Sequence, residues 1–474
     1  MNWEKLLCEK RQTRSKYPSK KDLRNEFQKD YHRIICSASF RRLQDKTQVF
    51  PLDKSDFVRT RLTHSLEVSS FAKSLGQTSF QYLIDKNIDS ELTAEIKDNV
   101  CSILECAGLI HDIGNPPFGH FGEDSIRNWF DANLTKIEFD GTTLERYLDE
   151  QIKSDLLRFE GNAQALRLLT KLHYLVDENG MHLTYALLNT LIKYPISSYE
   201  IDKHSGNIKT KKMGYYLAEK ELFEDITSST GAADCRYPLT YLLEAADDIA
   251  YLTADIEDAV KKGFLSYDQL LEELRSEKYI SKCADEDERK NYTNMIDWLE
   301  TKYQNAKAKK IANPELNAVQ NWVISIQGNL LYCASYGFTR NYRSIMEGTF
   351  TKDVLSVSRG NALSKALGGI AYEYVFRSKP ILKMEISAGN IINFLLDNFI
   401  PAAVNFDTGT KLSPMEDRLM CMISENYRQI YTIYSEGKSD KEKLYLRLLL
   451  VTDFVCGMTD SYAKRLYQEL SGIE

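Results

Sequence analysis

The stretch His111-Asp112-Ile113-Gly114-Asn115-Pro116-Pro117-Phe118-Gly119-His120-Phe121-Gly122-Glu123 gathers two histidines and two carboxylates around one rigid turn. Imidazole and carboxylate groups are ligands that divalent transition metals accept. His and Glu are also the commonest general acid/base groups of enzymes. A lone His-Asp pair is usually structural, so it is the density of ionisable groups around the turn that indicates a chemical site.

Two helical patterns flank this stretch on its N-terminal side. Residues 61–84 predict an amphipathic helix with His64 in its apolar stripe. Residues 90–113 predict a second helix, whose apolar face ends in His111 and whose end is marked by glycine and proline. A single buried histidine is more often a core residue with its hydrogen bonds satisfied, so neither histidine alone indicates a metal site.

A third helix, predicted over residues 239–260, places carboxylates on an apolar face. Asp247, Tyr251 and Asp255 follow one another at intervals of four residues and therefore share a face. A carboxylate among core residues is costly unless it is paired or binds a metal. Asp248 lies about 100° further round the helix, so we expect it to be a solvated or secondary group.

The composition is that of an ordinary globular protein. The chain has 474 residues, 43% apolar and 27% charged, which allows two to four domains or one large helical body. Its net charge of −7 argues against a globally basic nucleic-acid binder, although a local basic patch is compatible with it. The nine cysteines show no CxxC pair, which favours reduced thiols. The charged N-terminus lacks a signal-peptide pattern and no apolar run is long enough to span a membrane, so we expect a soluble, cytoplasmic protein.

A basic stretch lies between residues 30 and 50. Arg33, Arg41, Arg42 and Lys46 fall away from the apolar positions that a helix there would bury. Such a group could line an anionic pocket, but a solvated basic face is the commoner interpretation and is favoured by the sequence alone.

Together the three helices predict a metal-dependent hydrolase. His64, His111, Asp112 and Asp247 offer two imidazoles and two carboxylates, a set that suits Mn, Fe, Co, Ni or Zn and tolerates Mg less well. A bound metal activates water and polarises a phosphoryl group, so hydrolysis is the natural reaction. His120 and Glu123 are not needed as ligands and could supply the proton transfer.

The sequence motifs around these residues resemble those of the deoxyguanosinetriphosphate triphosphohydrolase family of HD-domain phosphohydrolases. The order of His64, His111-Asp112 and Asp247 matches the H…HD…D pattern of the HD superfamily. The more specific motifs are RRL at 41–43, KTQVFPL at 46–52, TRLTHSLEV at 60–68, the 111–123 stretch and EAADDIAY at 244–251. The resemblance extends from about residue 30 to the GMTD sequence at 457–460.

The resemblance implies a mainly all-α protein with an HD-domain helical core and additional helices. The sequence itself adds a small β-hairpin near 195–216, because the apolar period fades there and residues 204–207 have the composition of a turn. The charge pattern along the chain and the resemblance together divide it into an N-terminal arm (1–30), an HD-type catalytic core (31–262), a charged helical excursion (263–320) and a C-terminal helical part that completes the nucleotide pocket (321–474). Nothing functional is assigned to the excursion.

The implied reaction is the hydrolysis of dGTP to deoxyguanosine and inorganic triphosphate, by attack of metal-bound water on the α-phosphorus. His64, His111, Asp112 and Asp247 would hold the metal, with Mn²⁺ or Mg²⁺ expected and Fe, Co, Ni or Zn as alternatives. His120 and Glu123 would be the catalytic pair, with His120 donating or relaying a proton.

The resemblance also assigns substrate contacts. Gln48 and Val49 would meet the deoxyribose and base, and Tyr251 would pack under the sugar and exclude a 2′-hydroxyl. The other implied contacts are Asp255 in the pocket, Asn162, Lys193 and Lys212 on the phosphates, and Glu385 and Arg418 at the base.

Several alternatives stay open at this point. The protein could be an HD-domain nucleotide phosphohydrolase with another product, or a single-stranded nucleic-acid-binding protein with a regulatory dNTP site. The resemblance further raises an activating dNTP, regulation by single-stranded DNA and a homo-oligomer, with a hexamer suspected. The sequence does not fix the preferred dNTP or the native metal.

Overall fold

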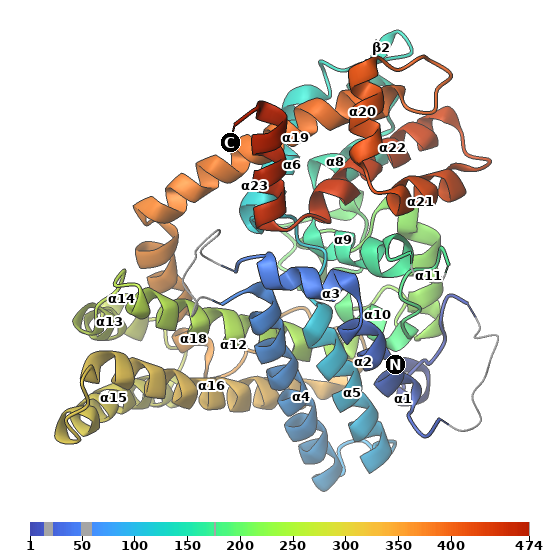
Figure 1. The fold of residues 1–474 in the computed structure, drawn as a ribbon. Helices are drawn as coiled ribbons and strands as arrows, with labels where there is room; N and C mark the ends of the chain where they lie inside the picture. Colours follow the sequence, from blue (N-terminus) through green and yellow to red (C-terminus); the bar gives the residue numbers. More distant parts are fainter. Residues whose placement is uncertain (14–21, 49–58, 175–176, 474) are drawn as a thin grey trace.

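The computed structural model describes residues 1–13, 22–48, 59–174 and 177–473, and helices dominate it (Figure 1). In this described part the only sheet is a two-stranded antiparallel hairpin. The prediction of a mainly all-α protein is therefore confirmed. None of the described helices combines the length and apolar character that crossing a bilayer requires.

Three helices form the centre of the lower part of Figure 1 and match the sequence predictions closely. They are α4 (Arg61–Asp85), α5 (Ala94–Ile110) and α12 (Pro238–Lys261). Helix α4 packs along α5, and α12 contacts both. Their contact is tight because Gly108 has no side chain, and a Cβ there would collide with the backbone of Ser69. This pairing brings the start of α4 beside the end of α5.

The helices of the 266–340 region extend this body. Helix α15 (Glu286–Ala308) packs on α16 (Pro314–Arg340), which in turn packs on α12 and α4. Tyr292 and Leu299 of α15 are buried in this contact, while many charged residues of the same helix are exposed. The charged region is therefore helical, as expected, and shares the main hydrophobic core.

The C-terminal helices form the upper part of Figure 1. The long helix α19 (Lys379–Asn405) crosses from the lower to the upper part and packs on α6 (His120–Asn133) and on α22 (Asp440–Cys456). Leu395 and Phe399 of α19 are fully buried there. One continuous helix thus joins the two parts.

The remaining elements are short or peripheral. The other α-helices are α1 (Trp3–Leu6), α2 (Glu26–Ile35), α3 (Ala38–Arg42), α7 (Leu144–Tyr147), α8 (Glu150–Leu157), α9 (Gly161–Arg167), α10 (Tyr185–Leu191), α11 (Lys220–Ser229), α13 (Tyr267–Leu274), α14 (Glu277–Ile280), α17 (Tyr342–Met346), α18 (Asn361–Ala371), α20 (Pro414–Met422), α21 (Glu425–Ser435) and α23 (Asp460–Ser471). The 3₁₀-helices are η1 (Leu43–Asp45), η3 (Ser198–Glu200), η4 (Ile208–Thr210) and η5 (Leu217–Glu219), and π-helical turns form η2 (Leu168–Leu172) and η6 (Tyr372–Phe376).

The small β-hairpin exists, but its predicted position near 195–216 was wrong. It is formed by β1 (Glu138–Phe139) and β2 (Thr142–Thr143), joined by Asp140 and Gly141, which both have positive φ. An Asp-Gly pair suits such a two-residue turn. The 195–216 region contains η3 and η4 instead, because side chains such as Asp202 and Asn207 accept nearby backbone N–H groups.

Candidate active site

Three helices bring His64, His111 and Asp247 together. His64 lies in the first turn of α4, His111 at the end of α5 and Asp247 within α12. Their ligand atoms all lie within 4.8 Å of one another, and the two histidine side chains are buried. Three of the four predicted ligands therefore form a group that could hold one metal ion.

The hydrogen bonding of His111 fits a cation at this point. Its Nδ1 lies 2.8 Å from the carbonyl oxygen of Gly108, which can only accept, so Nδ1 carries the proton. In the neutral ring, the lone pair of Nε2 then faces Asp247 Oδ1 at 3.2 Å, and Nε2 has no hydrogen-bond partner among the described residues. Two acceptors facing each other repel unless a positive charge lies between them, and a metal ion supplies that charge.

Asp112, the fourth predicted ligand, lies at the edge of this group. Its Oδ1 is 3.6 Å from His111 Nε2 and accepts a hydrogen bond from Asn115 at 2.6 Å, while Oδ2 accepts from Arg61. Burial alone would raise the pKa of Asp112, but the charges of Arg61 and His111 hold it well below the usual range. The carboxylate is therefore anionic and available beside the other three groups.

Lys193 directly contacts the set of His64, His111 and Asp247, which we call the metal group. Its Nζ donates to Asp247 Oδ2 at 2.8 Å. Burial would raise the pKa of Asp247, but Lys193 and His111 lower it well below the ordinary value. The lysine was predicted as a phosphate contact, and its position places a cation beside any anion bound at this group.

The turn after His111 is tight enough to require glycine. A Cβ at Gly114 would collide with the backbone of Ala165, so the turn lies directly on α9. Gly119 has a φ of 58° and closes on the guanidinium of Arg61. Arg61 consequently lies between Asp112 and Gly119, the residue that precedes α6.

His120 and Glu123 form the predicted pair in the first turn of α6. The imidazole Nδ1 lies 3.0 Å from Glu123 Oε2, and the ring is exposed while the carboxylate is buried. The hydrogen bond with Glu123 raises the pKa of His120. Burial would raise the pKa of Glu123, but His120, Lys212 and Arg127 hold it at about 2. The pair therefore has a charged carboxylate that favours the protonated imidazole.

A second carboxylate, Glu160, connects this pair to two predicted phosphate contacts. Arg127 Nη2 lies 3.3 Å from both Glu123 and Glu160. Lys212 Nζ donates to Glu160 at 3.0 Å, and the amide of Asn162 donates to the same carboxylate at 2.7 Å. Asn162 and Lys212 thus lie together beside the predicted His120–Glu123 pair.

Two of the predicted substrate contacts, Tyr251 and Asp255, follow Asp247 along α12. Tyr251 is one helical turn beyond Asp247 and stacks on Phe376. Asp255, a further turn on, is buried beside the Tyr251 hydroxyl, and burial raises the pKa of its carboxyl group well above the ordinary value. Gln48 has a buried side-chain oxygen without a described partner. Val49 lies outside the described residues.

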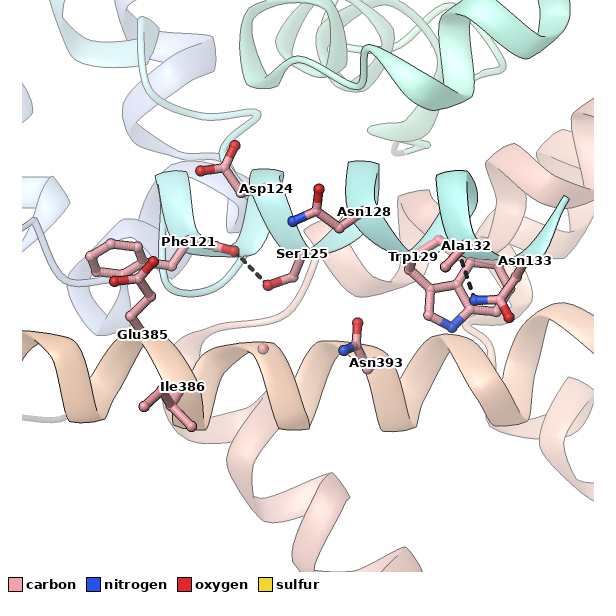
Figure 2. A pocket seen from close by; sticks show the side chains of 11 residues that line it. Phe121, Asp124, Ser125, Asn128, Trp129, Ala132, Asn133, Glu385, Ile386 and Asn393 are labelled. Carbon is pink, nitrogen blue, oxygen red and sulfur yellow. Dashed lines mark hydrogen bonds between the residues drawn. The ribbon is translucent and has the colours of Figure 1, made fainter.

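The two predicted base contacts are not brought to the metal group by the described contacts. Glu385 is exposed on α19 and lines a cavity of about 390 Å³ between α19 and α6. Figure 2 shows its side chain facing α6, where Phe121 and Asp124 begin the helix. Arg418 is exposed on α20. Their roles remain predictions.

Comparison with known proteins identifies the family. The HD domain matches residues 61–154. The chain is 47% identical to the deoxyguanosinetriphosphate triphosphohydrolase-like protein of Listeria monocytogenes, over the full length of both. The chain belongs to the deoxyguanosinetriphosphate triphosphohydrolase family. It is also 33% identical to a protein of the same description from Synechocystis sp., over the full length of both, and 32% identical to the deoxyguanosinetriphosphate triphosphohydrolase of Yersinia enterocolitica, with 94% of each chain covered.

Membership of the deoxyguanosinetriphosphate triphosphohydrolase family confirms the predicted resemblance and makes the protein a hydrolase with an HD domain. An HD domain implies a divalent metal, and the His64–His111–Asp247 group provides a suitable site.

Three residues of this hydrolase site were not singled out from the sequence. Arg61 precedes His64 by one turn of α4, and Arg127 follows Glu123 by one turn of α6, so helical spacing could have placed both beside predicted site residues. Glu160 gave no such signal, because it reaches the site from a different segment.

Proposed function

We propose that the protein hydrolyses deoxynucleoside triphosphates, with dGTP preferred, to a deoxynucleoside and inorganic triphosphate. The observation that carries this proposal is the metal group of His64, His111 and Asp247 with the His120–Glu123 pair beside it. Full-length relatives described as deoxyguanosinetriphosphate triphosphohydrolases or as like them support the choice of substrate.

The metal would be held by His64, His111 and Asp247, with Asp112 as a further ligand. Mn²⁺ or Mg²⁺ is proposed, and the imidazole nitrogens equally suit Fe, Co, Ni or Zn. When bound, such an ion polarises the phosphoryl group and makes water a better nucleophile at neutral pH.

His120 is proposed to supply the proton that the leaving group needs. Attack of water on the α-phosphorus breaks the bond to the 5′-oxygen of the deoxyribose, which leaves as a hydroxyl once it is protonated. The protonated imidazole is favoured by Glu123, which accepts from its Nδ1 and leaves Nε2 to donate. Glu123 is fixed in turn by the backbone N–H of Gly161 at 2.8 Å.

The cations around the site are proposed to bind the phosphates. Lys193 lies on the metal group, and Lys212 lies beside the catalytic pair. Arg61 has a buried Nε without a described partner and lies between Asp112 and Gly119. Cations on both sides of a bound triphosphate would stabilise its charge.

The sugar and base would lie toward α12. Tyr251 offers an aromatic face that would leave no room for a 2′-hydroxyl, and the buried side-chain oxygen of Gln48, which has no described partner, could bind a nucleoside. Asp255, buried beside Tyr251, is proposed as a further pocket residue. Val49, Glu385 and Arg418 remain proposals for base recognition.

The decisive experiment supplies Mn²⁺ or Mg²⁺ with each of the four dNTPs and GTP and identifies the phosphate product. Triphosphate and deoxyguanosine from dGTP, lost on metal chelation, are expected. Pyrophosphate or phosphate as the product would favour the other HD phosphohydrolase reaction. Absence of turnover with every dNTP and every pair of dNTPs would reject the proposal.

The same preparation addresses the remaining proposals about partners. A dNTP that stimulates hydrolysis of another would reveal an activating site. Light scattering measures whether the chain forms a homo-oligomer such as a hexamer, and salt-dependent retention on single-stranded DNA tests nucleic-acid binding.

A further inference from the structure

A cavity of about 400 Å³ opens beside the catalytic pair and is lined mainly by cations. It lies between the middle of α6, the end of α8 and the segment 201–212. We call it the basic pocket. Its five cationic side chains are Arg127, Arg158, Lys203, Lys211 and Lys212, and its two carboxylates are Glu160 and Asp202. The excess of positive charge marks it as a place where an anion would be stabilised.

The two carboxylates are already used within the protein. Glu160 is buried and accepts from Arg127, Asn162 and Lys212. Asp202 accepts the backbone N–H of His204 at 2.9 Å and so fixes the turn that follows it. Neither carboxylate forms an ion pair with Lys203 or Lys211 in the described part of the chain, and the five cations outnumber the two carboxylates.

Those lysines have no counter-charge in the described structure. The side chains of Lys203 and Lys211 are exposed and form no hydrogen bond or ion pair with the described residues. By contrast, the adjacent Lys209 donates to the carbonyl oxygen of Asp234 and does not line the pocket. Two cations with nothing to pair them face the same cavity from two sides of one turn.

The backbone holds this turn in place. Asp202 N–H donates to Thr210 O at 3.0 Å, which closes the turn, and Gly206 adopts a φ of 69° at its tip. Ile208 N–H donates to Thr351 O at 2.9 Å, which ties the turn to a distant part of the chain. The positions of Lys203 and Lys211 are therefore set by the fold.

The basic pocket is connected to the proposed chemistry through Arg127. This guanidinium contacts both Glu123 of the catalytic pair and Glu160 of the pocket. Lys212 belongs to the pocket and also lies near enough to Glu123 to lower its pKa. Arg127 and Lys212 therefore belong both to the pocket and to the surroundings of the His120–Glu123 pair.

We propose that the basic pocket binds an inorganic polyphosphate chain, and that it receives the triphosphate which the proposed reaction releases. This rests on the proposed function for the origin of the triphosphate, while the site itself rests on the pocket. Lysine and arginine side chains around a cavity of this size suit a short, flexible, highly charged chain. The distal phosphates of bound substrate have the same chemistry and are the other source to be distinguished.

The first experiment measures binding of magnesium tripolyphosphate to the full-length protein by calorimetry. The double variant Lys203→Ala/Lys211→Ala removes two charges from the pocket. The control Lys209→Ala/Lys220→Ala removes two charges nearby, outside the pocket. We expect the pocket variant to weaken binding at least tenfold and the control to stay within about twofold. Equal effects of the two variants, or no effect of either, would overturn the proposal.

The second experiment separates the two sources during dGTP hydrolysis. If the pocket receives the released product, the pocket variant raises the inhibition constant of tripolyphosphate and leaves the KM for dGTP unchanged. If it holds the distal phosphates of the substrate, both constants rise together, which supports the polyphosphate site and rejects the product route.

Failure of the two proposals can be told apart. Normal production of triphosphate with unchanged tripolyphosphate inhibition in the pocket variant would overturn the basic pocket alone. Tripolyphosphate binding that depends on Lys203 and Lys211, without turnover of any dNTP, would overturn the proposed function and the product route, and would leave the polyphosphate site established.

Discussion

At the scale of single residues, the metal group places two hydrogen-bond acceptors, His111 Nε2 and Asp247 Oδ1, next to each other. His111 donates its Nδ1–H to the carbonyl oxygen of Gly108, so the lone pair of its Nε2 faces Asp247. Burial would lower the pKa of His111, but Asp112 and Asp247 raise it. The site therefore attracts positive charge, which a proton or a metal ion can supply.

Removal of His111 should abolish metal binding. We expect His111→Ala to lose bound metal and at least about a hundredfold of activity, because even the outer partners of metal ligands commonly contribute ten- to a hundredfold. Elemental analysis of the purified protein and initial rates with dGTP measure the two effects. His32→Ala, at an exposed histidine, is the control and should retain both metal and activity. Full metal content in His111→Ala would contradict the ligand assignment.

The His120–Glu123 pair predicts a pH dependence with a definite sign. Because Glu123 raises the pKa of His120, the imidazole stays protonated to higher pH than an isolated histidine. A general acid must be protonated, so activity should fall as pH rises through this raised pKa. Glu123→Gln removes the charge, and the alkaline limb of the kcat profile should move to lower pH while kcat falls about a hundredfold. An unmoved limb would show that His120 is not the acid.

At the scale of helices, much of the fold could be predicted from the sequence. The apolar stripe predicted a helix at 61–84, and the structure has Arg61–Asp85; the 239–260 pattern became Pro238–Lys261. These long amphipathic helices bury one continuous face, so their period alone determines which residues point inward. That is why His64, His111 and Asp247 could each be predicted to point inward.

Short elements could not be placed in the same way. The predicted hairpin near 195–216 and the actual one at 138–143 are both polar turns with glycine, and local sequence distinguishes them poorly. Glu160 was missed for a related reason. Its contacts with Arg127 and Lys212 join segments that are 33 and 52 residues away, and no helical period relates them.

The carboxylate of Asp460 links three segments of the chain near the proposed substrate contact Gln48. Asp460, at the start of α23, accepts from the backbone N–H and hydroxyl of Thr47 and from the backbone N–H of Phe118. Lys46 adds hydrogen bonds to the carbonyl oxygens of Asn115 and Cys456. The loop carrying Gln48 and the turn after His111 are thereby fixed to the C-terminal helices.

Asp460→Asn should loosen this connection. We expect a loss of about 2 kcal/mol in the free energy of unfolding, because hydrogen bonds to a charged acceptor are replaced by weaker ones. We also expect the KM for dGTP to rise more than kcat falls, since Thr47 precedes the proposed substrate contact Gln48. Urea titration and steady-state kinetics measure these effects. Asp131→Asn on the exposed side of α6 is the control, and an equal response of both variants would count against the role of Asp460.

At the scale of the whole molecule, a buried ionic cluster joins the catalytic part to the C-terminal helices. Arg167 on α9 binds Asp453 of α22 with two nitrogens, and its Nη1 donates to Glu219 at 2.8 Å. Lys171 lies 3.0 Å from the same Glu219. Two cations balance two anions away from water, although the partners are up to 286 residues apart in sequence. No local pattern could have predicted this balance.

This cluster should make the two parts unfold together. Arg167→Met leaves two carboxylates with one lysine, and Asp453→Leu leaves two cations with one carboxylate. Each single variant should therefore lose about 3–5 kcal/mol, as expected when a buried charge loses its partner. The double variant Arg167→Met/Asp453→Leu keeps the balanced Lys171–Glu219 pair and should be more stable than either single variant.

Urea unfolding followed by circular dichroism measures these differences, and one shared transition is expected in the unmodified protein. The exposed pair of Arg377 and Glu373, at 3.1 Å, provides the matched control, because loss of a solvated ion pair costs less than about 1 kcal/mol. If the double variant loses the sum of the two single effects, the charges act independently, and the cluster does not couple the parts. If it recovers stability, charge balance across α9 and α22 holds the proposed active site against the C-terminal helices.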